Sequence, residues 1–407
     1  MVTQDTSNSS GPLHIPELIR FQCTRCANCC NSWPVPLNGD DVSRLSSTGQ
    51  ELVYSALSSA EKQDGLQGFS HALEKRDDGR CVFLSPSEAC LVHETAKPAM
   101  CKLFPYSFMD CPEGVYLGLS FASSGVLHNS GALLSEQQKE LQETLQLFRE
   151  LFPDLRPSSL AGWSKIQLLE GLALPYGQAR LLIQDLLRRL ADSLCGAQDA
   201  GALEILCDFY NELVSKCPSS FFRPRIATSS SAQVDNFWLS ALFDSYLSER
   251  FKPVNDQILA VRVAEQISQG DSDSCTDLSL GAAVALQTRD RRLELSSSSQ
   301  NLLLRFVFMR VFSRMFFGPG FSSLSFIAGL GHLTSLIALL HLDMKVHMSK
   351  AVNDQTQNFD QFNYLAEQLR QLDGKLTSAR YGNNCRAMLE LLFLDNRRLD
   401  RLRELAL

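Results

Sequence analysis

The chain has 407 residues, of which 44% are hydrophobic and 20% charged, and its formal net charge is −7. This length exceeds what one small core can organise and predicts two or three packed units. The mild acidity, without any long Lys/Arg run, argues against a nucleic-acid-binding protein, so no nucleic-acid partner is expected.

The first residues are polar. The stretch "MVTQDTSNSSGPLH" has neither the basic start nor the apolar core of a signal peptide. We therefore expect a disordered leader over residues 1–15 and a cytoplasmic location. In a reducing compartment, clustered cysteines are metal ligands more often than disulfides. The total of 13 cysteines is also odd, which full pairing cannot accommodate.

A cysteine-rich segment follows the leader. Eight of the 13 cysteines lie between residues 23 and 111. This part of the chain is rich in turn residues and poor in long periodic stretches, which predicts a small irregular metal-binding domain over residues 16–130. Within it, a helix fits residues 38–57, and alternating apolar residues predict a short strand over 114–121.

The cluster begins with "FQCTRCANCC" at residues 21–30. A C-x2-C pair can hold one metal because the turn between the cysteines points both sulfurs inward, and a distant cysteine can close a four-thiolate site. The C-x2-C-x2-C run is similar to the first three ligands of ferredoxin-type iron–sulfur sites, but all-sulfur sites serve zinc equally well. The candidate ligands are Cys23, Cys26, Cys29, Cys30, Cys81, Cys90 and Cys101, with Cys111 and His93 left open.

An alternative is that these cysteines are small buried hydrophobic residues, as free cysteines often are. That interpretation suits the single cysteines Cys195, Cys207, Cys217, Cys275 and Cys385. Four cysteines within eight positions favour metal binding instead. A nucleophilic pair of Cys90 and His93 is conceivable, but ligation explains that neighbourhood better.

The rest of the chain, residues 131–407, is expected to be an all-α body. Ser135 with Gln138 three residues later resembles a capping box, and that helix should stop at Pro153. Helical periodicity recurs over 160–174, 176–194, 201–216 and 233–250, and then, after a polar linker near 268–280, over 299–317, 360–372 and 384–407. The expected fold class is mainly α.

The stretch 321–342 carries no Asp, Glu, Lys or Arg and is long enough to span a membrane. His332, His341 and several hydroxyl residues favour a buried helix instead, so no membrane span is expected. Its "IAGLGHL" is the one candidate for a glycine-rich turn that binds S-adenosylmethionine. Because it has no acidic partner, helix-packing glycines are the better interpretation, and no catalytic or cofactor-binding residue is assigned.

Several separated elements together resemble a known family. The four early cysteines, then "GRCVFL", Cys90 and "KPAMCKLFPYSF", are similar in order and spacing to the zinc- or iron-chelating CxxCxxCC family over about residues 21–108. Lys97-Pro98 stands where that family often has Arg-Pro, and Ala27 where it often has Gly. The resemblance implies that the first domain chelates zinc or iron.

A wider resemblance concerns the whole chain. The length, the helical body and the Phe-rich "NLLLRFVFMRVFSRMFF" look similar to flagellin lysine-N-methylases. That resemblance implies methyl transfer from S-adenosylmethionine to lysine side chains of a protein substrate such as flagellin. Ser123 or Ser124 stands where those enzymes often have a further cysteine. The alternative is a non-catalytic metal-binding protein whose helical body binds a partner, so enzymatic activity stays open.

Overall fold

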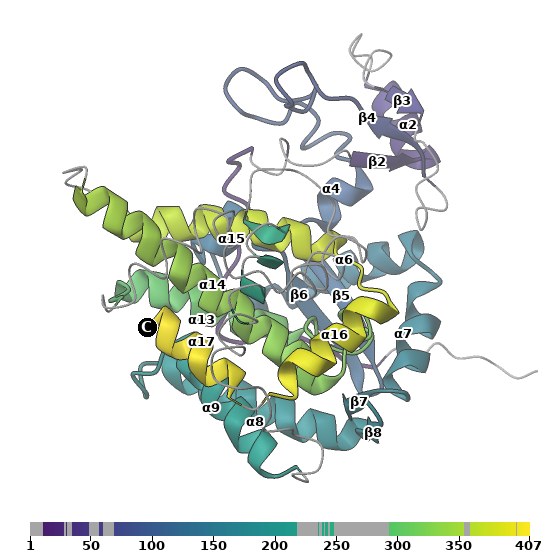
Figure 1. The fold of residues 1–407 in the computed structure, drawn as a ribbon. Coiled ribbons are helices and arrows are strands. Elements are labelled where there is room, and N and C mark those ends of the chain that lie inside the picture. Colours follow the sequence, from purple (N-terminus) through teal and green to yellow (C-terminus); the bar gives the residue numbers. More distant parts are fainter. Residues whose placement is uncertain are drawn as a thin grey trace, which may run out of the picture. The chain divides into compact units, whose positions relative to one another are not determined.

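The computed structural model describes residues 11–27, 30, 35–48, 57–59, 69–217, 235, 238–239, 241–242, 245–247, 293–353, 359–395 and 397–407. The chain divides into two compact units, and Figure 1 shows its elements. Unit 1 comprises Met1–Phe108 and Glu113–Arg156. Unit 2 comprises Met109–Pro112 and Pro157–Leu407.

Two small sheets organise the first part of the chain. One has the strand order β1-β6-β5, and the other is antiparallel with the order β2-β4-β3. β1 runs parallel to β6, with Leu13 opposite Val115. The strands are β1 (Leu13–His14), β2 (Val35–Asn38), β3 (Leu57–Ser59), β4 (Phe69–Leu73), β5 (Tyr106–Cys111) and β6 (Gly114–Leu119).

Short helices accompany these sheets. They are α2 (Gly39–Ser46), α4 (Ala99–Leu103), α5 (Ser124–Leu127), the 3₁₀ turn η1 (Leu134–Gln137) and α6 (Gln138–Leu151). α6 buries Leu141 and Leu145, and its Phe148 ring lies 5.3 Å from that of Phe108. Elements this short bury little apolar surface each, so the unit depends on side-chain clusters between them.

Helices dominate the described chain beyond residue 154, which confirms the mainly α fold class. They are α7 (Leu155–Trp163), α8 (Tyr176–Leu194), α9 (Ala202–Ser215), α13 (Ser297–Phe312), α14 (Phe326–Asn353), α15 (Gln361–Ser378), α16 (Asn383–Phe393) and α17 (Arg398–Ala406). α14 contacts α9, α15, α16 and α17, and α13 packs on α8. The core of unit 2 is therefore built around α14.

α14 contains the apolar stretch that the sequence singles out. Over Phe326–Met348 this helix is long and apolar enough to cross a membrane, but the window that passes this test is fully buried inside the chain's own packing. A Cβ on Gly329 would lie 2.1 Å from the carbonyl oxygen of Phe316, and one on Gly331 would lie 2.4 Å from the Phe393 ring. The two glycines thus serve close packing, as expected.

The two histidines of α14 are core residues. The Tyr381 hydroxyl lies 3.0 Å from His332 Nε2, and His341 Nδ1 lies 2.8 Å from the carbonyl oxygen of Ile337. Burial lowers the pKa of His332 to about 3 and that of His341 to about 4. Both imidazoles are therefore neutral at physiological pH.

Four local predictions need correction. Residues 160–174 do not form one helix: α7 ends at Trp163, and the chain then forms a hairpin of β7 (Gln167–Leu169) and β8 (Leu172–Ala173). The turn of this hairpin contains Gly171, whose φ of 82° is a backbone conformation that favours glycine. Ser135 is not an N-cap, because it lies inside η1, where Glu136 Oε2 accepts from the Leu133 amide at 3.3 Å.

The predicted helix 38–57 is shorter in the structure, since α2 ends at Ser46 and residue 57 begins a strand. Leu13–His14 form β1, so part of the leader predicted over residues 1–15 is a strand. The predicted linker at 268–280, residues 1–10 and most of 233–250 lie outside the described residues.

Candidate metal centre

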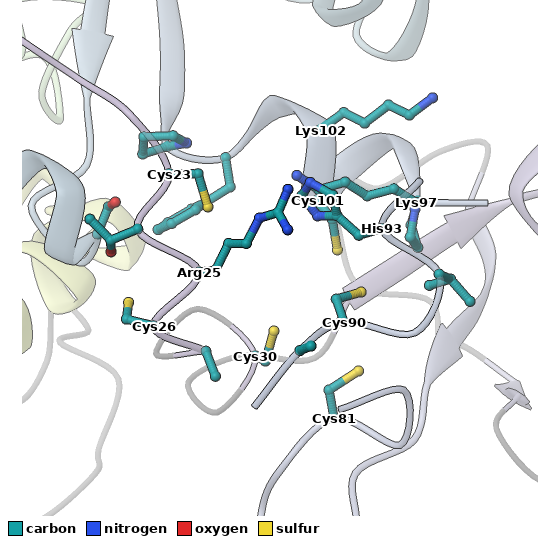
Figure 2. Close-up of a pocket in the computed structure, with 18 of the residues that line it drawn as sticks. Cys23, Arg25, Cys26, Cys30, Cys81, Cys90, His93, Lys97, Cys101 and Lys102 are labelled. Carbon is teal, nitrogen blue, oxygen red and sulfur yellow. The ribbon is translucent and has the colours of Figure 1, made fainter. Parts of the chain in front are cut away.

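Unit 1 contains a pocket of about 610 Å³ lined by six of the seven cysteines predicted to bind metal. Figure 2 shows these side chains around the pocket. They are Cys23, Cys26, Cys30, Cys81, Cys90 and Cys101. Cys29 lies outside the described residues. Cys111 is buried at the end of β5 and does not line this pocket, whereas His93 does.

The first cysteine segment is an irregular loop with left-handed backbone positions. Arg25 has a φ of 52° and Ala27 a φ of 58°. The Cys30 amide donates to the Ala27 carbonyl over 2.8 Å, which holds these two backbone positions close together. A residue with a Cβ pays roughly 1–2 kcal/mol for this conformation, so glycine would suit the Ala27 position well.

The second segment contains two turns of the same form. Each begins at a cysteine, whose carbonyl accepts from the amide three residues later. Leu84 donates to Cys81 over 3.0 Å, and His93 donates to Cys90 over 3.2 Å. The repeated geometry presents two sulfurs from two separate short turns to one pocket.

The sulfurs of these two turns also accept backbone hydrogen bonds. The Phe83 amide donates to the Cys81 sulfur, and the Val92 amide donates to the Cys90 sulfur. Amide donation to sulfur favours the thiolate, and such bonds are among the features that tune metal–thiolate centres. Each turn is therefore preorganised for a negatively charged sulfur.

Backbone bonds tie the two cysteine segments together. The Cys81 amide donates to the Cys30 carbonyl over 3.0 Å, and Lys75 Nζ donates to the same oxygen over 2.6 Å. One hydrophobic cluster contains or contacts four of the cysteines. We call them the inner thiols: Cys30, Cys81, Cys90 and Cys101. Cys23, by contrast, is exposed.

The inner thiols influence one another's ionisation. Burial raises the pKa of Cys81 and Cys90, and it raises the pKa of Cys101 to about 12. Cys30 adds to the increase at each of these three thiols, so the four sulfurs lie within electrostatic reach of one another. Without a metal the protonated thiols are favoured, and a bound cation would reverse that preference.

Asp41 positions the last of the inner thiols, and the sequence analysis missed it. Asp41 is fully buried in α2, and its Oδ1 accepts from the Ala99 amide over 3.0 Å at the start of α4. α4 carries Cys101. The Asn38 side chain accepts from the Asp41 amide over 2.8 Å in a capping box, and this Asn-x-x-Asp spacing was the available signal.

Positive charges line the pocket beside the thiols. Arg25, Lys97 and Lys102 belong to its wall, together with His93. The pKa of His93 is lowered by burial and, next, by the charge of Lys97. Its imidazole is therefore neutral at physiological pH, the form that can bind a metal.

The donor set fits zinc or an iron–sulfur cluster, since both accept four thiolates. Among the described residues, no group of three or more His, Cys, Asp or Glu side chains is close enough to hold an ion as it stands. The sulfurs would therefore move together when a metal binds. Such movement is expected where metal binding and folding are coupled.

Comparison with known proteins gives one match. Residues 22–132 match the family model of the CxxCxxCC domain, described as a "putative zinc- or iron-chelating domain". No significant match was found among curated proteins or among solved structures. The matched segment contains every inner thiol and most of the residues that line the pocket. Residues 22–132 are thus similar to the CxxCxxCC domain.

Proposed function

We propose that this protein binds zinc or an iron–sulfur cluster through the inner thiols, and that the metal organises unit 1. One observation carries the assignment: four thiols from separate short segments share one pocket wall and one hydrophobic cluster. The amide donors to two of the sulfurs support the same ligand set. Thiolates are preferred ligands of zinc and of iron–sulfur clusters.

Cys23, Cys26 and Cys29 are proposed ligands on the strength of their spacing. Cys23 and Cys26 line the same pocket as the inner thiols. With seven candidate cysteines, the domain has enough sulfur for one four-thiolate site with spare ligands, or for a second site. Metal stoichiometry distinguishes the two arrangements.

The test is metal analysis of protein purified without oxygen. A brown protein with broad visible absorption indicates an iron–sulfur cluster, and a colourless protein with stoichiometric zinc indicates a zinc site. Cys81→Ser and Cys90→Ser should each lose most of the metal. Cys195→Ser, which changes an exposed cysteine of unit 2, is the matched control and should keep it. Unchanged metal content in both pocket variants would remove these cysteines from the ligand set.

Lysine methylation is the catalytic function that we propose for the whole chain. It is supported by the resemblance to flagellin lysine-N-methylases, and it implies S-adenosylmethionine, a protein substrate such as flagellin and a cytoplasmic location. The packed glycines of α14 do not supply a cofactor-binding turn. Mass spectrometry of flagellin incubated with S-adenosylmethionine should show 14-dalton increments on lysine. Absence of both methylation and cofactor binding would favour the non-catalytic alternative.

A further inference from the structure

The turns that present Cys81 and Cys90 belong to a repeated loop. We call residues 75–84 the Cys81 loop and residues 84–93 the Cys90 loop. In each loop an isolated β-bridge pairs the first residue with the cysteine, which is the seventh residue. The second loop therefore repeats the first, nine residues further along the chain.

The backbone of the two loops has the same hydrogen bonds and the same left-handed position. The amide of the second residue donates to the carbonyl of the sixth, over 2.8 Å in the Cys81 loop and 2.9 Å in the Cys90 loop. The fifth residue has a positive φ in both loops, 79° at Gly79 and 62° at Glu88. The two loops thus share one backbone conformation, and a difference between them must come from their side chains.

The second residue of the Cys81 loop is Arg76, and its side chain bonds to the turn of the cysteine. Arg76 Nη2 donates to the Val82 carbonyl over 2.9 Å and to the Leu84 carbonyl over 2.5 Å. Both carbonyls follow Cys81, and the Leu84 amide closes the turn by donating to the Cys81 carbonyl. Because a charged donor makes stronger hydrogen bonds than a neutral one, the guanidinium holds this turn firmly.

The second residue of the Cys90 loop is Ser85, whose side chain is too short to reach the turn in the same way. The Ser85 hydroxyl accepts from the Ala89 amide over 3.0 Å. This bond lies before Cys90 in the chain, whereas the bonds of Arg76 lie after Cys81. The two cysteines are therefore presented by the same backbone but are supported differently.

We propose that Arg76 is a positioning residue of the metal site, which fixes the turn of Cys81 and thereby the place of its sulfur. This inference rests on the proposed metal site. A ligand whose turn is already fixed needs less rearrangement when the thiols come together around a metal. Cys81 is the anchored ligand, and Arg76 acts on the metal through it.

The first test compares two arginines of the Cys81 loop in the full chain. Zinc affinity is measured by competition with a chromophoric chelator at fixed pH. Arg76→Met should weaken zinc binding by about tenfold to hundredfold, the usual effect of removing a partner of a metal ligand.

Arg80→Met is the matched control, since it removes the same charge from the same loop. The Arg80 side chain is 40% exposed and pairs with Asp78 over 3.9 Å and with Glu88 over 3.5 Å, both of them exposed carboxylates. Such surface ion pairs contribute little, so zinc affinity should change by less than about threefold.

A double-mutant cycle separates positioning of Cys81 from general stabilisation of the domain. In the Cys81→Ser background, Arg76→Met should change zinc affinity by less than about twofold, because the ligand it positions is gone. In the Cys90→Ser background, the loss of about tenfold or more should remain. A weak competing chelator keeps both serine backgrounds measurable.

Two results would overturn this inference and leave the proposed metal site intact. One is an equal change in zinc affinity in Arg76→Met and Arg80→Met. The other is the same loss in both serine backgrounds, which is the result expected if Arg76 only stabilised the fold. A wild-type protein that takes up neither zinc nor iron would overturn the proposed function and this inference with it.

Discussion

Units 1 and 2 achieve stability by different means. In unit 1 the longest described helix is α6, with 14 residues, and cysteines form part of the hydrophobic cluster beside the pocket. In unit 2 α14 has 28 residues, and its most apolar window is fully buried among other helices. A region with so few long elements gains from a metal, whereas a region built around an apolar helix does not need one.

Metal removal should show the largest difference between the two units. Chelation is expected to lower the free energy of unfolding of residues 20–110, and with it their protection from hydrogen exchange, because metal binding and folding are coupled in such domains. α14 should stay protected, since its core contains none of the proposed ligands. Hydrogen exchange with mass spectrometry measures both regions in one sample. Equal loss of protection in the two units would contradict this division.

A substitution that overpacks the core tests unit 2 in place of unit 1. Gly331→Val places a side chain where a Cβ already lies 2.4 Å from the Phe393 ring, and it should cost about 1–3 kcal/mol of unfolding free energy. Metal content should be unchanged. Gly374→Ala is the control, because nothing lies within 4 Å of its Cβ position in α15. It should stabilise by about 0.5–1 kcal/mol. Denaturant titration and metal analysis measure the two effects.

Asp41→Ala should weaken zinc binding and lower the stability of unit 1. It removes the acceptor of the Ala99 amide and frees the helix that carries Cys101. We expect about tenfold weaker zinc binding, together with a loss of about 1 kcal/mol from the two lost caps. Asp40→Ala changes the exposed neighbouring carboxylate and should have little effect on zinc affinity. Chelator competition distinguishes the two variants.

The smallest difference is expected in how the stability of the protein changes with pH. Burial raises the pKa of Cys101 from 9.0 to about 12, so folding favours the protonated thiol. The stability that this group adds to the metal-free protein is present below pH 9 and is lost as pH rises toward 12. With metal bound, the thiolate is already formed and this loss should disappear. Urea titrations at pH 7.5 and 9.5, with and without metal, test the difference.

The sequence predicted the long regular elements well and the short ones poorly. The helix predicted over 176–194 has the same bounds as α8, because one amphipathic period runs through it. Residues 160–174 also predicted one helix, but α7 ends at Trp163 and residues 167–173 form a hairpin whose turn contains Gly171. Hydrophobic periodicity indicates a continuous apolar face of a helix. It does not show where a single turn reverses the direction of the chain.

Prediction from the sequence has the same limit at the candidate metal site. Spacing indicated that the cysteines bind metal, and resemblance gave the family that matches residues 22–132. The grouping of Cys30 with Cys81, Cys90 and Cys101 depends on long-range backbone bonds, such as that from Cys81 to Cys30. Asp41 acts on a helix 58 residues away in the chain. Contacts of this kind are set by tertiary structure and leave no local pattern.

The buried position of α14 has a consequence for synthesis of the chain. Its partners α16 and α17 span Asn383–Phe393 and Arg398–Ala406 and are translated after it. During that interval a nascent helix with the length and hydropathy of a membrane span is only partly covered by the helices that precede it. Its protection in the cell then depends on the speed of translation and on chaperones that shield apolar segments. Slowing translation between residues 353 and 383 should therefore lower the yield of folded protein more than slowing it within unit 1.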